Sequence, residues 1–140
     1  MLAFGLFYYF AYFRQSSRAL IISNFPWSKV SSFEISDRGI VGHKVIVINH
    51  PDTVALLINL LKKSAKVDLD KINFRASSGY CSIDVIYKDG EKNDLDLANT
   101  DESGGILRSG DYSYRNDDLL REIIVQLRSK SAKKMTNKYE

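Results

Sequence analysis

The chain of 140 residues has little cysteine, proline, histidine or tryptophan. Because Cys81 is the one cysteine, no disulfide can form within the chain. The two prolines leave no Pro-rich linker, and the length suits one domain of ordinary size. An apolar content of 44% is enough for a real core, which excludes wholesale disorder.

Residues suited to catalysis or metal binding are equally sparse. His43 and His50 lie seven residues apart around a β-rich run, so strand alternation places them on opposite faces. His50, just before Pro51, is better placed to cap a helix. Cys81 falls on the apolar face of an alternating strand, where a thiol is normally buried and inert. We therefore expect no catalytic residues and no enzyme activity.

Ligand-binding motifs are also missing. The stretch DLDLANTDESGG (94–105) lacks the ligand offsets of a calcium loop, and the glycines at 104, 105 and 110 lack the spacing of a phosphate-binding loop. We expect no metal and no cofactor. Nucleic-acid binding needs basic residues with aromatics on a folded surface. Here residues 84–118 carry a balance of −6 and the basic residues gather in 128–140, at +4, so we expect no nucleic-acid partner.

The longest uncharged stretch is at the N-terminus. Residues 1–13 are apolar or aromatic with Gly5 as the one small break, and Arg14 and Arg18 follow. A spanning helix needs about 17–25 apolar residues, so this run is short. Three interpretations remain open: a truncated membrane anchor, which we favour, a buried N-terminal helix, or a degenerate export signal without a basic n-region. The residues expected to contact the membrane are Phe4, Phe7, Tyr8, Tyr9, Tyr12, Arg14 and Arg18.

The periodicity of the remaining chain predicts an α+β fold. Alternating runs at 30–36, 43–49, 80–87 and 92–98, with shorter ones near 106 and 112–114, indicate strands. Alternation places Asp84, Asp94 and Asp96 on the side away from the core. We expect a turn at 37–39, a two-residue hairpin turn at Asp89-Gly90 and a flexible acidic loop at 99–105. Residues 72–75 are a candidate for a further short strand.

Helices are expected from Pro51 to about Lys63 and after Asn116, which caps the second helix and where Leu119, Ile123 and Leu127 share one face. The first helix is apolar nearly all round, so we expect it to be buried on more than one face. The predicted order is ββα-ββββα: an antiparallel sheet of about five to six strands, two helices packed on one face, and an apolar N-terminal helix before it.

Three regions follow from this pattern. Residues 1–22 form the apolar N-terminal segment, 23–128 a single α+β domain, and 129–140 a basic flexible tail. The basic flank after the apolar run favours a membrane-associated protein with its domain in the cytoplasm, and an outward-facing domain remains the alternative.

Charge patterning yields the leading functional hypothesis. Acidic hairpins would engage a protein partner with a basic surface, as in an inhibitor, an immunity-like protein or an accessory subunit of an envelope complex. The residues assigned to this contact are Asp84, Asp89, Glu91, Asp94, Asp96, Asp101, Glu102 and Asp111. The alternatives are a structural subunit of an obligate assembly and, less favoured, a small hydrolase. The acids could also serve only to keep exposed hairpins soluble.

Overall fold

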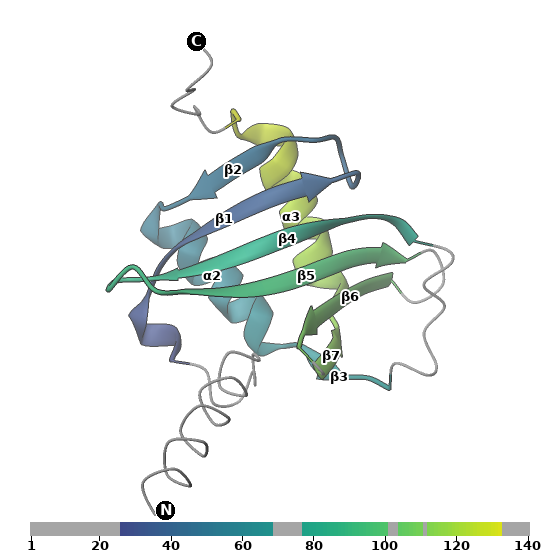
Figure 1. Cartoon of the computed structure of the whole chain (residues 1–140), viewed down its shortest axis with the longest axis horizontal. Coiled ribbons are helices and arrows are strands. Elements are labelled where there is room, and N and C mark those ends of the chain that lie inside the picture. The colour runs from purple at the N-terminus through teal and green to yellow at the C-terminus, as the bar shows by residue number, and fades with distance from the viewer. Residues whose placement is uncertain (1–25, 69–76, 101–103, 111, 133–140) are drawn as a thin grey trace, which may run out of the picture.

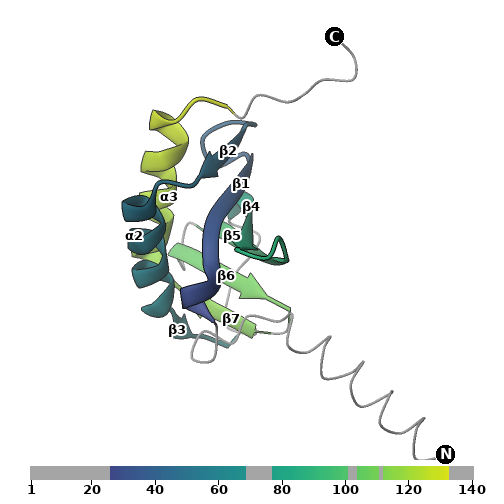
Figure 2. The ribbon, with the colours of Figure 1, turned by 90° about the vertical axis from the view of Figure 1, so that its left-hand side faces the viewer.

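One antiparallel sheet with two helices on one face forms the domain (Figures 1 and 2). The computed structural model describes residues 26–68, 77–100, 104–110 and 112–132. Within them the elements are η2 (Trp27–Lys29), β1 (Val30–Arg38), β2 (Val45–Ile48), α2 (Pro51–Lys62), β3 (Ala65–Lys66), β4 (Ser77–Tyr87), β5 (Lys92–Thr100), β6 (Gly104–Ser109), β7 (Tyr112–Arg115) and α3 (Asp117–Ser129). The strand order is β2-β1-β4-β5-β6-β7-β3.

The α+β class and the two helices are confirmed, but the sheet is larger than predicted. The described residues contain seven strands rather than five to six. The additional strand, β3, has two residues, too few to produce an alternating pattern, and it pairs with β7. The predicted N-terminal helix and the possible strand at 72–75 lie outside the described residues.

Strand alternation separates an apolar sheet face from a polar one. In β1, β4 and β5 the residues Phe33, Ile35, Ile83, Val85 and Leu97 are all at most 1% exposed and belong to one core cluster. Figure 2 shows both helices on this side of the sheet. Burying apolar side chains between the sheet and the helices is the main driving force for this arrangement.

The helices meet this core with different faces. In α3 the apolar stripe of Leu119, Ile123 and Leu127 is buried, as its spacing predicts. In α2, Leu57 and Leu61 are buried, whereas Leu56 is 42% exposed. The nearly all-apolar sequence of α2 led us to expect burial on more than one face, and the exposure of Leu56 shows that one of its faces remains open to solvent.

Two turns differ from their sequence predictions. The β4–β5 hairpin has a three-residue loop. The N–H of Tyr87 donates to Glu91 O at 2.9 Å, and the N–H of Gly90 donates to Tyr87 O at 3.0 Å. The Asp-Gly pair had indicated a two-residue turn. Such a turn needs positive φ at its first residue, here Asp89, but only Gly90 has a positive φ (89°).

The second difference concerns Asp37. We read 37–39 as a turn, but β1 continues to Arg38 and the Asp37 side chain is buried. Its carboxylate accepts the N–H groups of Ile40, Val41 and Gly42 at 2.7–3.0 Å. These charge-assisted bonds satisfy the backbone of the β1–β2 loop and fix its shape.

Asn116 connects three elements at the start of α3. Its Oδ1 accepts the N–H of Leu119 at 3.0 Å and caps the helix, as the sequence predicts. Its Nδ2 donates to Leu60 O near the end of α2 and to Ser64 Oγ before β3, both at 2.8 Å. Its backbone N–H donates to Gly105 O in β6 at 2.8 Å. The residue is 6% exposed, so these bonds replace its contacts with water.

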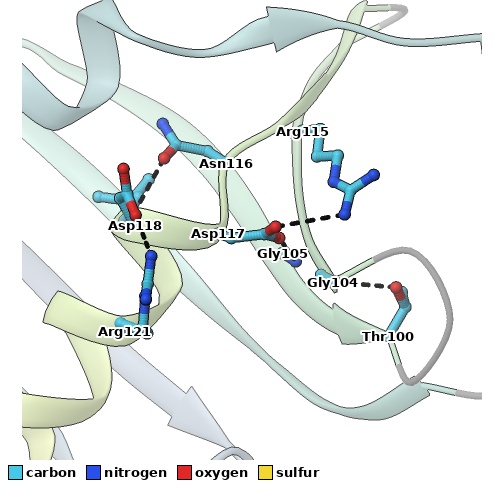
Figure 3. A network of polar contacts seen from close by, with 9 residues as sticks. Thr100, Gly104, Gly105, Arg115, Asn116, Asp117, Asp118 and Arg121 are labelled. Atoms are coloured by element: carbon cyan, nitrogen blue, oxygen red, sulfur yellow. Dashed lines mark hydrogen bonds and ion pairs between the residues drawn. The ribbon is translucent and has the colours of Figure 1, made fainter.

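Gly104 and Gly105 allow β6 to approach the first turn of α3 (Figure 3). The N–H of Gly105 donates to Asp117 Oδ1 at 2.8 Å, and Thr100 Oγ1 donates to Gly104 O at 2.8 Å. A Cβ on Gly105 would lie 2.6 Å from Asn116 O. The sequence reading placed these glycines in a loop, but they begin a strand whose contact with the helix requires the absence of a side chain.

Replacing Asn116 by alanine should destabilise the domain by about 2–4 kcal/mol. The change removes the cap of α3 and both Nδ2 bonds, to Leu60 O and Ser64 Oγ. Leu60 O keeps the N–H of Lys63 as a donor. Urea unfolding followed by circular dichroism measures it. As a control, His50→Ala removes the exposed cap of α2, where Asp52 N–H donates to His50 Nδ1 at 3.3 Å, and should cost less. Equal losses for the two variants would contradict the connecting role of Asn116.

Gly105→Ala should destabilise the fold by about 1–3 kcal/mol, because the added methyl overlaps the backbone of Asn116, the cap of α3, and the Cβ of Leu120. Gly42→Ala is the matched control, since a Cβ there has no atom within 4 Å. Thermal unfolding of both variants tests the point. A Gly105→Ala protein as stable as the parent would show that β6 and α3 are not in close contact.

Candidate functional site

The sheet face opposite the helices carries a row of carboxylates. Since Ile83, Val85, Leu95 and their neighbours point toward the helices, the intervening residues of each strand point to the other side. In register, Glu34 of β1 lies opposite Asp84 of β4, and Asp84 lies opposite Asp94 of β5. We call Glu34, Asp84, Asp94 and the nearby Asp96 the acidic sheet face.

Asp96 has a different setting from the other three. Its register partners are Ser82 on β4 and Arg108 on β6. Ser82 Oγ donates to Asp96 Oδ1 at 3.3 Å. Asp96 therefore has a hydroxyl and a guanidinium as cross-strand neighbours, whereas Asp84 has carboxylates on both sides.

The carboxylates around Asp84 change its proton affinity. Partial burial is the largest influence, and together with a side-chain hydrogen bond to Asp94 and the charges of Asp94 and Glu34 it raises the pKa of Asp84 from 3.8 to about 6. Lys92 acts in the opposite direction. The folded protein thus holds this proton more tightly than the unfolded chain does. The resulting stabilisation is full below pH 3.8 and is lost as the pH rises to about 6.

The remaining acids of the predicted contact set are not part of this row. Asp89 and Glu91 are exposed in the β4–β5 loop, where Asp89 Oδ1 accepts the N–H of Glu91 at 3.0 Å. Asp101, Glu102 and Asp111 lie outside the described residues. From the predicted set, the structure thus brings Asp84, Asp94 and Asp96 together on one sheet face. Asp89 and Glu91 lie in the loop that joins the same two strands.

Sequence reasoning missed Glu34. Alternation in 30–36 does place it on the side opposite Phe33 and Ile35. What the sequence did not indicate is that β1 pairs with β4, fifty residues further along, as well as with β2. The sequence does offer one sign of Glu34: it is the one acid between Phe33 and Ile35, on the side of its strand that faces away from the core.

Cys81, the candidate nucleophile in the sequence, is part of the core. Cys81 is fully buried on the helix-facing side, and burial, with smaller effects of Asp37 and Asp96, raises the pKa of its thiol to about 12. At neutral pH it is a thiol rather than a nucleophilic thiolate. Among the described residues no group of three or more histidines, cysteines and acids is arranged to hold a metal ion.

The predicted membrane contacts, from Phe4 to Arg18, lie outside the described residues. In the part of the chain that the structure describes, every helix is too short or too polar to cross a bilayer.

Asp84→Asn should stabilise the protein at pH 7.5 by up to about 1 kcal/mol, a small value because solvent screens partly exposed charges. At about pH 3, Asp84 is protonated in both the folded protein and the unfolded chain, so the variant and parent should be almost equally stable. Urea unfolding at both pH values measures the difference.

Asp96→Asn is the matched control. This carboxylate faces Ser82 and Arg108 rather than another acid, so its removal should bring no gain at pH 7.5. A stabilisation by Asp84→Asn that is the same at both pH values, or a loss at pH 7.5, would contradict the carboxylate row.

No known protein family matches the chain, and neither a curated protein nor a solved structure does. A function for the chain therefore rests on the chemistry of its own residues, foremost the acidic sheet face.

Proposed function

We propose that the chain is a membrane-attached, non-catalytic binding domain whose acidic sheet face engages a basic protein partner. The observation that carries this proposal is the register Glu34–Asp84–Asp94, which sets like charges opposite one another across three strands. Such pairs destabilise a sheet. Departures from local stability rules of this kind are expected where a surface serves binding.

The position of the row favours contact with another protein. It lies on the sheet face that the helices leave open, and Asp94 and Asp96 are exposed. A basic partner would relieve the repulsion between the carboxylates on contact. Complementary charge mainly accelerates association and selects the partner. The exposed acids of the β4–β5 loop, Asp89 and Glu91, extend the negative surface along the same hairpin.

Membrane attachment comes from the sequence. The run Met1–Phe13 followed by Arg14 and Arg18 is the proposed anchor, with the domain on the cytoplasmic side. An inhibitor, an immunity-like protein or an accessory subunit of an envelope complex would combine such an anchor with a charged binding surface.

A structural subunit of an obligate assembly is the alternative. The exposure of Leu56 (42%) on α2 and of Val125 (53%) on α3 favours it. Against it, Leu57 and Leu61 are buried within the chain and Leu60 packs against the same core. Most of the apolar surface of α2 is thus covered without a partner.

A hydrolase is the weaker alternative. The Asp84–Asp94 pair has one property of an acid–base site, namely a carboxyl group with a raised pKa beside a second carboxylate. Catalysis also needs a concave site that encloses the substrate and excludes water. The pair lies instead on the face of a sheet, a position better suited to a protein partner.

Reversing two charges on the acidic sheet face tests the proposal. Asp94→Lys combined with Asp96→Lys should leave the fold nearly intact, since both side chains are exposed. Partners chemically cross-linked to the parent in cells should be recovered at least ten-fold less with this variant, because the complementary field is reversed. Cross-linking followed by mass spectrometry, with circular dichroism as the folding check, measures both effects.

Asp68→Lys with Glu122→Lys is the matched control. It changes the net charge by the same amount, but at positions just after β3 and in α3, outside the acidic sheet face. It should keep the partner. Equal recovery with both double variants would show that the acidic sheet face is not the contact surface.

A further inference from the structure

Four lysines gather at the end of the domain where the described chain begins. Lys29 ends η2, Lys62 and Lys63 close α2, and Lys66 lies in β3; all four are exposed. Figures 1 and 2 show η2, the last turn of α2 and β3 at the same end of the molecule. We call these four residues the basic end.

The local contacts of these lysines leave the positive charge at the surface. Lys62 and Lys63 complement the dipole at the C-terminus of α2. Lys66 Nζ lies 5.6 Å from the centre of the Tyr112 ring. The nearby acids Asp117 and Asp118 at the start of α3 form ion pairs with Arg115 and Arg121. Three acids offset part of this charge: Asp68, two residues after Lys66, and Asp89 and Glu91 of the β4–β5 loop, in which the N–H of Lys88 donates to Lys29 O at 2.9 Å.

The chain that precedes this end limits what it can meet. Twelve residues, 14–25, join the apolar run to Pro26, and two of them are arginines. Even fully extended they span at most about 40 Å. If residues 1–13 are held in a membrane, as the proposed function requires, the basic end is the part of the domain that directly follows this tether.

We propose that the basic end docks on anionic lipid headgroups of the membrane in which the N-terminal segment is anchored. This inference rests on the membrane attachment in the proposed function. Each lysine close to an anionic surface strengthens attraction roughly five-fold. The tether supplies a high effective concentration, so contacts that are weak for a free domain become populated.

Docking through this end sets the orientation of the whole domain. The acidic sheet face lies on the sheet surface opposite the helices, and its hairpin end reaches the basic end at Lys29, whose O accepts the N–H of Lys88 at 2.9 Å. The lysines on α2 and β3 lie away from this hairpin (Figure 1), so docking through them leaves the acidic sheet face open to a partner. The rival is the far end of α3, where Arg128 and Lys130 precede Lys133 and Lys134. That end lies across the domain from Pro26 and is less closely tethered.

A single fluorophore placed at each end distinguishes the two. Cys81 is 0% exposed, so an introduced cysteine is the reactive one. The full chain carrying Ser28→Cys in η2, or Ser131→Cys after α3, is labelled with an environment-sensitive dye. Each protein is reconstituted into vesicles of phosphatidylcholine alone or with 30% phosphatidylserine, with brominated lipid as quencher. Flotation of the vesicles measures attachment separately.

The expected result is flotation with both vesicle types and quenching of the Ser28→Cys label on phosphatidylserine vesicles only. Changing the four lysines of the basic end to glutamine should abolish this quenching and leave flotation intact. Changing Arg128, Lys130, Lys133 and Lys134 to glutamine removes the same charge and should leave the quenching unchanged.

Other outcomes overturn the inference in recognisable ways. Flotation with equal quenching on both vesicle types would reject docking while membrane attachment stands. Quenching of the Ser131→Cys label instead would assign the contact to the far end of α3. Absence of flotation from both vesicle types would reject attachment itself, and with it this inference.

Discussion

Asn116 joins α3 to α2 through its side chain and to the sheet through its backbone N–H. One amide group caps α3 and, through its Nδ2, binds the last turn of α2 and the start of the β3 segment. Its backbone N–H binds β6 beside the two glycines. A buried amide with all its partners in place makes one relative arrangement of these elements more stable than any other. With α2 and α3 joined in this way, both helices cover one face of the sheet, and the opposite face carries no helix (Figure 2).

That free face is where the strand register places charge. Packing under the helices requires Phe33, Ile83 and Leu95 to point inward, and their strand neighbours Glu34, Asp84 and Asp94 must then point outward together. The repulsion within this row is a consequence of the register and not of any local turn. One sheet face is thus used for the domain's own core, and the opposite, acidic face is the one proposed to meet a partner. The basic end adds a third surface, directed toward the proposed anchor.

Local signals were sufficient for most elements of the fold. The Asn116 cap, the apolar stripe of α3 and the alternation of β4 and β5 each depend on a few neighbouring residues, and each is confirmed. Features that depend on distant residues were missed. β3 exists because Ala65 and Lys66 meet β7 fifty residues away, and Gly105 is in a strand because α3 packs over it. The same limit applied to the site: Asp84, Asp94 and Asp96 were predicted to point outward, but the alignment of Glu34 with Asp84 follows from long-range pairing.

The most direct measurement is a carbon-13 NMR titration of the side-chain carboxyl group of Asp84 in the full chain. If Asp84 faces carboxylates across β1 and β5, its pKa is raised to about 6. Replacing Glu34 by glutamine should lower this pKa, because one neighbouring negative charge is removed. If Asp84 titrates near 3.8 and does not respond to the change at Glu34, the carboxylate row does not exist and the acidic sheet face loses its basis.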